Sequence, residues 1–263
     1  MTEKNLTRIT GIGSALVDIL INESDEFLTN LGKEKGGMTL VEDKDIQEIL
    51  TRTNQTPVIV PGGAACNTIV GIGNLGGNAR FIGRRGDDGY GEVFEKQIVK
   101  CNVEPLVSIS DSPTGKVLSV ITPDAQRSMF TFLGASTELD PELISPDMFK
   151  DTAISMIEGY LLFNKELMMA AIKAAKASGS LIALDLASFE VVNAAREILE
   201  DIIKDFVDIL IANEDEAKAY TGYEDEQKAI ETLSQHVTYA VLKLGKRGRY
   251  VSYNDTITRI YAQ

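Results

Sequence analysis

Two groups of residues near the N-terminus have the chemistry to bind the hydroxyl groups of a ligand. Asp18 interrupts the apolar run SALVDILI, where a lone carboxylate is costly unless it is hydrogen-bonded or faces a pocket. It is therefore either a ligand for hydroxyl groups or a strand-end carboxylate in water, and the run itself favours neither. The segment GGAACN follows at 62–67, where Gly62 and Gly63 allow close approach of backbone and Asn67 offers a directed polar side chain.

Two later groups could bind phosphate and a metal ion. Asn213-Glu214-Asp215-Glu216 follows the apolar run VDILIA and is explained structurally by a helix N-cap with acids in the first turn. Glu216 could equally orient hydrated Mg²⁺, which favours carboxylates and retained waters. The segment KLGKRG at 243–248 is either an ordinary turn between strands or a phosphate site made of backbone amides and lysine or arginine side chains.

The composition excludes several functional classes. The chain has 263 residues and a formal net charge of −13, which argues against nucleic-acid or anionic-membrane binding. Cys66 and Cys101 have no metal-ligand spacing, and with a single His236 neither a zinc cluster nor a histidine triad is expected. The N-terminus lacks a signal-peptide pattern. These features predict a soluble, cytoplasmic protein without a membrane partner.

The sequence GIGNLG at 71–76 matches the GxGxxG pattern of dinucleotide-binding proteins. That interpretation requires a strand before the pattern and a helix that opens at it. Here the pattern lies at the end of an expected helix, 64–75, so helix packing and a C-cap at Gly76-Gly77 are favoured. A nicotinamide dehydrogenase is therefore the disfavoured alternative, and no Walker A sequence is present.

Strand and helix patterns alternate along the chain, which predicts an α/β fold with a parallel sheet. Expected strands lie at 8–13, 15–21, 79–83, 152–162, 181–186, 207–212 and 239–244, with a hairpin at 250–263; expected helices lie at 64–75, 89–101, 165–178, 190–204, 214–220 and 225–236. Ligands bind such sheets at the carboxyl ends of strands, which selects Asp185, Asn213 and 243–248. The segments at about 17–40 and 103–133 are expected to form a small sheet outside this core, with antiparallel strands in the second segment.

Together, these pieces resemble the ribokinase-like (PfkB) family of sugar and nucleoside kinases. Asp18, GGAACN, GRRGDDGYG at 83–91, NEDE and KLGKRG occur in the order of that family. The sequences PDAQRSMFTFLGAS at 123–136 and GGM at 36–38 are most similar to its adenosine-kinase branch, and Arg127 matches a recurrent arginine of its lid.

The resemblance implies a three-layer α/β core with a small β lid, in one domain that spans 1–263. It implies transfer of the ATP γ-phosphoryl group to a hydroxymethyl group of a sugar or an adenosine-like nucleoside, with Mg²⁺ and in some members a monovalent cation, in a monomer or homodimer. Asp18, Gly62, Gly63 and Asn67 would hold the acceptor, with Gly62-Gly63 at a lid hinge. Five residues would serve the nucleotide and metal end: Asn213, Glu216, Lys243, Gly245 and Gly248.

One family motif is missing from the sequence. The family carries Gly-Ala-Gly-Asp near its C-terminus, which supplies the base for the acceptor hydroxyl, and these 263 residues contain no such sequence. The catalytic base is therefore unassigned. We expect a C-terminally incomplete kinase domain with little turnover by itself. The alternative is a catalytically inactive sugar- or nucleoside-binding or regulatory protein of the same fold.

Overall fold

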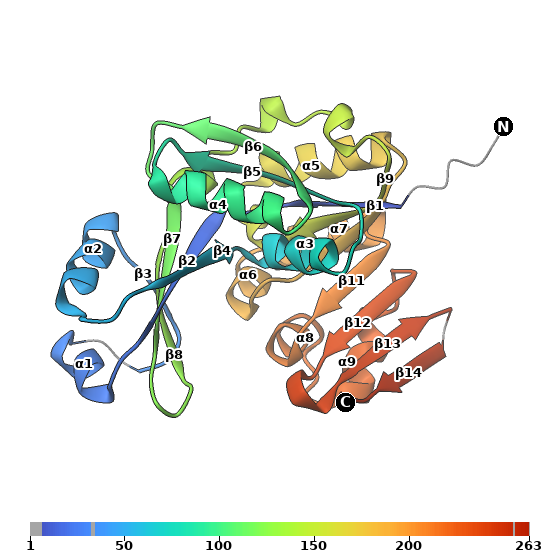
Figure 1. The fold of residues 1–263 in the computed structure, drawn as a ribbon. Coiled ribbons are helices and arrows are strands. Elements are labelled where there is room, and N and C mark those ends of the chain that lie inside the picture. The colour runs from blue at the N-terminus through green and yellow to red at the C-terminus, as the bar shows by residue number, and fades with distance from the viewer. Residues whose placement is uncertain (1–6, 33–34, 255, 263) are drawn as a thin grey trace.

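Two β-sheets and their covering helices form the computed structural model, which describes residues 7–32, 35–254 and 256–262 (Figure 1). Within these residues the large sheet has the strand order β14-β13-β12-β11-β10-β9-β1-β5-β6, and the small sheet has the order β3-β8-β7-β2-β4. The strands are β1 (Arg8–Ile12), β2 (Leu16–Asn22), β3 (Met38–Leu40), β4 (Val58–Gly62), β5 (Ala79–Gly86), β6 (Val103–Ser110), β7 (Gly115–Ile121), β8 (Arg127–Phe132), β9 (Thr152–Glu158), β10 (Leu181–Asp185), β11 (Ile209–Ala212), β12 (Tyr239–Lys243), β13 (Arg249–Tyr253) and β14 (Thr256–Ile260). The predicted α/β class with a large parallel sheet and a smaller second sheet is confirmed.

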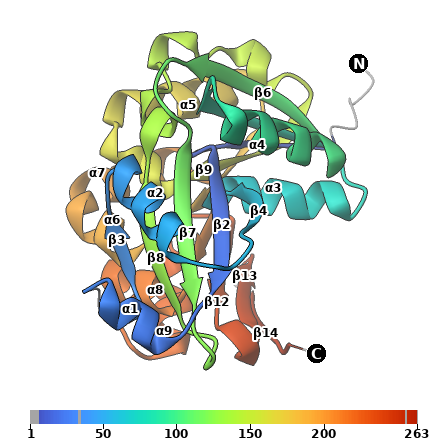
Figure 2. The same cartoon turned by 60° about the vertical axis from the view of Figure 1, so that its left-hand side comes forward.

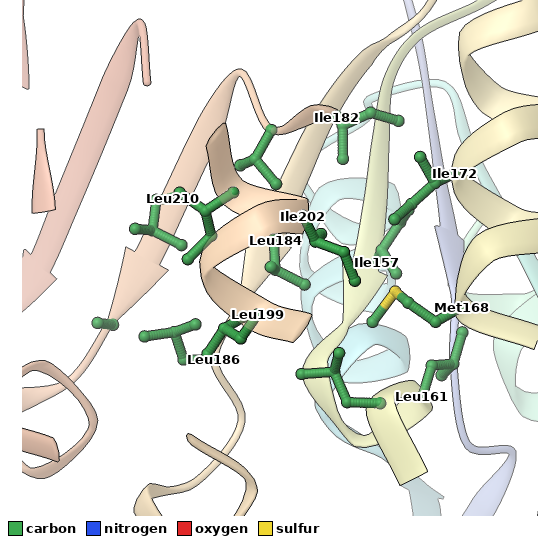
Figure 3. Packing of buried hydrophobic residues seen from close by; sticks show 14 of the residues in the cluster. Ile157, Leu161, Met168, Ile172, Ile182, Leu184, Leu186, Leu199, Ile202 and Leu210 are labelled. Atoms are coloured by element: carbon green, nitrogen blue, oxygen red, sulfur yellow. The ribbon is translucent and has the colours of Figure 1, made fainter. Parts of the chain in front are cut away.

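Helices cover the large sheet because its strands are apolar on both faces, as in other parallel sheets. The helices are α1 (Asp25–Asn30), α2 (Asp43–Arg52), α3 (Ala64–Asn74), α4 (Gly89–Lys100), α5 (Lys165–Ala177), α6 (Phe189–Ala194), α7 (Arg196–Phe206), α8 (Glu214–Thr221) and α9 (Glu226–Leu233). Strand residues Ile182, Leu184 and Leu210 pack against Ile172 of α5 and Leu199 and Ile202 of α7 (Figure 3). No helix in the described ranges is long and apolar enough to cross a membrane.

The small sheet has one covered face and one open face. Val17, Ile19, Leu118 and Phe130 are buried in a core cluster that also contains residues of α1 and α2. Strand side chains alternate between faces, so Asp18 lies on the opposite face. Helices α1 and α2 lie on the outer side of this sheet, and the face of Asp18 is turned toward α6 and α8 (Figures 1 and 2).

The expected boundaries of the small sheet need correction. The stretch 103–110, expected in the small sheet, is β6, which pairs in parallel with β5 at the edge of the large sheet. Strand β4, outside both expected segments, joins the small sheet by antiparallel pairing with β2. An alternating pattern predicts a half-exposed strand but carries no information about its partner strand.

Two further expectations have mixed outcomes. Strands β7 and β8 pair antiparallel as predicted, but β7 pairs in parallel with β2. The single helix expected over 190–204 is two helices, α6 and α7, that meet at Ala195. The backbone of Ala195 leaves the helical region there, and the sequence has no glycine or proline to announce the break.

The GIGNLG pattern ends a helix, as predicted. Gly73 lies against the Cys101 carbonyl, where a Cβ would overlap the oxygen. Gly76 has a φ of +83°, and the Gly77 amide donates to the Ile72 carbonyl at 2.9 Å, which closes the helix end. The dinucleotide interpretation of this segment therefore lacks its required geometry.

Candidate functional site

Asp18 and Gly62 form the first part of the site. Strand β2 places Leu16 opposite Gly62 of β4, and the Asp18 carboxylate lies against the Gly62 backbone, where a Cβ would overlap it. Burial raises the pKa of Asp18 to about 6, and the positive charge of Arg127 acts in the opposite direction. Arg127 lies on the same face as Asp18, because Thr131 is across β7 from Asp18 and Arg127 is four residues away along β8. A half-buried carboxylate beside an arginine can bind a hydroxyl group.

The start of α3 forms the wall beside this carboxylate. Gly63 is the N-cap of α3, and its φ of +100° is strained for any other residue. A Cβ on Gly63 would overlap the Ser14 carbonyl oxygen, so the turn packs directly on the β1–β2 connection. Asn67 lies in the first helical turn with an exposed side chain, and its backbone N–H donates to the Gly63 carbonyl at 2.9 Å. The structure thus brings Asp18, Gly62 and Gly63 together and places Asn67 one turn into the helix.

Glu158 is a site residue that the sequence reasoning missed. It ends β9, is 1% exposed, and accepts hydrogen bonds from Ser14 Oγ at 2.9 Å and from the Ala65 amide at 3.0 Å. Burial raises its pKa, and the neighbouring charge of Asp185 raises it further, while these hydrogen bonds lower it. Glu158 therefore joins the β1–β2 connection to the first turn of α3. The strand expected over 152–162 needs correction, because β9 ends at Glu158 and Gly159–Phe163 form a 3₁₀ helix.

Replacing Gly62 with alanine tests whether backbone space at this turn serves Asp18. The added methyl group would overlap the Asp18 carboxylate, so we expect acceptor affinity to fall by about tenfold or more from displacement of that group. The control is Gly71→Ala in α3, where a Cβ meets no atom within 4 Å and alanine should stabilise the helix by about 0.5–1 kcal/mol. Calorimetric titration with the acceptor and urea denaturation separate the two effects. Unchanged affinity in Gly62→Ala would contradict the interpretation.

The second part of the site lies along the carboxyl ends of neighbouring strands. Asp185 ends β10 directly beside Glu158 of β9 in the strand register. Asn213 follows β11, and Lys243 ends β12, so the order along the sheet edge is Glu158, Asp185, Asn213, Lys243. This is the edge at which open α/β sheets bind ligands. The sequence placed three of these four positions, Asp185, Asn213 and Lys243, at strand ends, and the structure brings these ends together; their role in binding stays a prediction.

Asn213 and Glu216 form a complete capping box at the start of α8. The Glu216 amide donates to Asn213 Oδ1 at 2.9 Å, and the Asn213 amide donates to Glu216 Oε2 at 2.7 Å. Asn213 Nδ2 also donates to Glu216 Oε1 at 2.7 Å. Burial raises the pKa of Glu216, which is 2% exposed. The capping box alone is therefore a sufficient structural role for Asn213 and Glu216. A contact with a ligand would be a second role.

Lys243 and the turn after β12 form the end of this row. Lys243 Nζ is 2.8 Å from Asp185 Oδ2, and the other Asp185 oxygen accepts from the Ala187 amide at 3.0 Å. Gly245 has a φ of +54° with open space where a Cβ would stand, whereas a Cβ on Gly248 would overlap the Ile260 carbonyl. The first glycine is thus open to a ligand, and the second packs against β14.

Arg247 fixes this turn to the neighbouring helices. Its guanidinium pairs with Glu214 of α8 and Glu226 of α9. The sequence suggested these basic side chains as phosphate ligands. In the structure, Arg247 forms salt bridges with two glutamates, and Lys243 forms one with Asp185. Lys246 lies exposed on the same turn.

The carboxylates of this edge fit a hydrated magnesium ion better than a directly bound one. In the described part of the chain, no three His, Cys, Asp or Glu side chains are grouped to hold a metal ion. Both Glu216 oxygens already accept hydrogen bonds from Asn213, so direct coordination would disturb the capping box. Magnesium at phosphate sites keeps several waters and uses one or two carboxylates with the phosphates. Any contact between Glu216 and such an ion would therefore run through water.

A separate polar cavity of about 540 Å³ lies away from these residues. Its lining includes Lys176, Asp208 and His236, which precede or flank the amino ends of β11 and β12. The single histidine of the sequence thus lies at the amino ends of these strands, opposite to the carboxyl ends that carry Asp185 and Lys243.

Comparison with known proteins identifies the family. The sequence profile described as pfkB family carbohydrate kinase matches residues 36–263. The chain belongs to this family. Its fold also matches the crystal structure of adenosine kinase from Sinorhizobium meliloti, with 31% identity and a TM-score of 0.87 over 98% of this chain and 80% of that one. A probable sugar kinase from Rhizobium etli CFN 42 matches with 26% identity and a TM-score of 0.88 over the same shares of the two chains.

The curated relatives of this PfkB chain are named after different phosphoryl acceptors. It is 30% identical over 236 residues to probable fructokinase-7 of Arabidopsis thaliana, which covers 84% of the chain and 63% of the relative. It is 24% identical over 266 aligned residues to guanosine-inosine kinase of Escherichia coli K12, which covers 95% of the chain and 61% of the relative. The chain thus spans less than two thirds of the length of these relatives. The family is a sugar and nucleoside kinase family, and the relatives do not agree on an acceptor.

Proposed function

We propose that this chain binds a nucleoside or sugar acceptor and ATP for phosphoryl transfer to a hydroxymethyl group, with an adenosine-like acceptor favoured. The observation that carries the proposal is the half-buried Asp18 carboxylate, held against Gly62 at the turn that leads into α3. The likeness to the Sinorhizobium meliloti adenosine kinase supports the choice of a nucleoside.

The acceptor would lie between the small sheet and the start of α3. In the ionised state, Asp18 accepts hydrogen bonds from two hydroxyl groups, while the Asn67 amide can both donate and accept. Gly62 and Gly63 keep this side of the site free of side chains, so the acceptor can approach the backbone. Because Gly62 ends β4 of the small sheet and Gly63 caps α3, movement at these two residues would carry Asp18 toward or away from α3.

The nucleotide would lie along the edge from Asn213 to Gly248. Phosphoryl transfer depends on positioning and on neutralising charge on the phosphate oxygens. Lys243, which pairs with Asp185, would supply a positive charge, and Gly245 leaves open space at the turn. A bound Mg²⁺ would neutralise phosphate charge, and Glu216 would hold it through water.

The base that activates the acceptor hydroxyl is outside these assignments. Asp185 is paired with Lys243, and Asp18 grips the acceptor, so each has another role in the proposed site. We therefore expect residues 1–263 to bind both ligands and to consume ATP slowly. The alternative, a binding or regulatory protein of the same fold, shares the acceptor site and differs in turnover.

Thermal-shift measurements with separate ligands test the proposal. Adenosine, guanosine, ribose, fructose and MgATP are added singly, and a ligand at about 100 times its Kd should stabilise the protein by about 2.7 kcal/mol. We expect stabilisation by MgATP and by one of the acceptors, with adenosine the first candidate. ATP consumption with that acceptor then distinguishes a kinase from a binding protein. Stabilisation by none of these ligands would overturn the proposal.

A further inference from the structure

A buried threonine fixes the point at which the chain enters the small sheet after β6. Thr114 precedes β7 and is 0% exposed. Its amide donates to Asp88 Oδ2 at 2.8 Å, and its hydroxyl donates to Asp88 Oδ1 at 2.6 Å. The same hydroxyl oxygen accepts from the Gly86 amide at 3.0 Å. The amide and the hydroxyl of Thr114, just before β7, are therefore held by Gly86, which ends β5 of the large sheet, and by Asp88, which follows it.

Asp88 is itself held rigidly at the start of α4. It is the N-cap of that helix, and its Oδ1 accepts from the Gly91 amide at 2.8 Å. Burial acts to raise the pKa of Asp88, but the hydrogen bonds from Thr114 and Gly91 outweigh it and leave the pKa below its ordinary value. The carboxylate is thus ionised near neutral pH, where its charged hydrogen bonds are strong.

The backbone around Thr114 is also closely packed. The segment that follows β8 also contacts the residues before β7, because the Ala135 amide donates to the Pro113 carbonyl at 2.9 Å. A Cβ on Gly134 would overlap that carbonyl, and a Cβ on Gly86 would overlap the backbone of Ser112 and Thr114. Close contacts of this kind leave little room for local adjustment. A displacement of the Thr114 backbone should therefore also displace the neighbouring residues of β7.

Strand register connects Thr114 to the acceptor site. Strand β7 begins at Gly115, which is paired with Leu16, and two residues later Val117 is paired with Asp18. The parallel ladder between β2 and β7 is continuous from Leu16 to Asn22. A displacement at the start of β7 therefore moves the strand that carries Asp18.

We infer that Asp88 and Thr114 are positioning residues, which set the place of Asp18 relative to the large sheet and thereby the affinity for the acceptor. The inference rests on the proposed acceptor role of Asp18. It assigns a purpose to the second aspartate of GDDGYG at 86–91, Asp88, which caps α4 and binds the residue before β7 with one carboxylate.

Isosteric replacement of Thr114 tests the inference through the acceptor. Thr114→Val removes the hydroxyl and keeps the side-chain volume, so the KM for the acceptor should rise by roughly tenfold, with the KM for ATP unchanged. Thr114→Ser should restore the wild-type KM. The control is Thr152→Val, which removes an equally buried hydroxyl bonded to Thr10 at 2.7 Å in the large sheet and should lower stability alone. Equal KM values in Thr114→Val and Thr152→Val would overturn the inference.

Hydrogen exchange gives a readout that does not need turnover. We expect faster amide exchange in β2 and β7 of Thr114→Val than in the wild type and Thr152→Val, with α5 unchanged. Asp88→Ser keeps a cap for Gly91 but lacks the second oxygen that accepts from the Thr114 amide, so it tests the same connection should Thr114→Val not fold. A wild type that uses no acceptor while Thr114→Val still loosens β2 refutes the proposed function and retains the positioning role. Unchanged exchange in β2 refutes the positioning role itself.

Discussion

Replacing Asp18 with asparagine is expected to weaken acceptor binding and at the same time to stabilise the folded protein. The substitution removes a charged acceptor of hydrogen bonds, which corresponds to about 1.5–3 kcal/mol, or roughly 10- to 100-fold in Kd. It also removes a carboxylate whose pKa is raised to about 6 by burial. After allowance for partial exposure, we expect about 1–2 kcal/mol of added stability near pH 8. Calorimetric titration and urea denaturation measure the two quantities.

The pH dependence of the wild type follows from the same pKa. The folded-state pKa of Asp18 lies above the ordinary value of 3.8, so the stability that this group contributes is present below about pH 4 and is lost as pH rises through about 6. Acceptor binding has the opposite trend, because the ionised carboxylate is the binding form. Affinity should therefore fall below about pH 6 in the wild type and stay flat in Asp18→Asn.

An exposed carboxylate elsewhere in the chain provides the matched control for this substitution. Asp87→Asn changes the net charge by the same amount at an exposed position, and should alter neither stability nor affinity. Equal acceptor affinity in Asp18→Asn and the wild type would contradict the assigned role of Asp18.

The sequence predicted those parts of the site that follow from strand order. Asp185, Asn213 and Lys243 each come at or just after an apolar run, and parallel strands bring their carboxyl ends to one edge. The glycine turn at 62–63 was predictable because a positive φ and close backbone contact both require glycine. In both cases, the information is local or follows from one topological rule.

Long-range partners could not be predicted in this way. The place of β6 depends on its pairing with β5, and the pattern of 103–110 is compatible with either sheet. Glu158 was missed because its two partners, Ser14 and Ala65, lie far away in the sequence. An acidic residue after an apolar strand is ordinarily solvated, and its burial here results from three elements that meet only in the folded chain.

Each oxygen of Glu158 accepts one hydrogen bond, so substitution by alanine and by glutamine should have different effects on stability. Glu158→Ala leaves Ser14 Oγ and the Ala65 amide without their partner and opens a cavity, so it should destabilise the protein by about 3–4 kcal/mol. Glu158→Gln can still accept from the Ala65 amide through its oxygen, and its NH₂ group can donate to Ser14 Oγ. We therefore expect the glutamine variant to fold and to retain acceptor binding.

The charge of Glu158 determines how this contrast depends on pH. Burial raises its folded-state pKa above the ordinary value of 4.5, so its contribution to stability is present below that value and is lost as pH rises through the folded-state pKa. The glutamine variant carries no such charge, and near pH 8 it should equal or exceed the wild type in urea denaturation. The alanine variant should be destabilised at every pH. If glutamine destabilises the protein as much as alanine does, the turn before α3 requires the charge of Glu158 as well as its two hydrogen bonds.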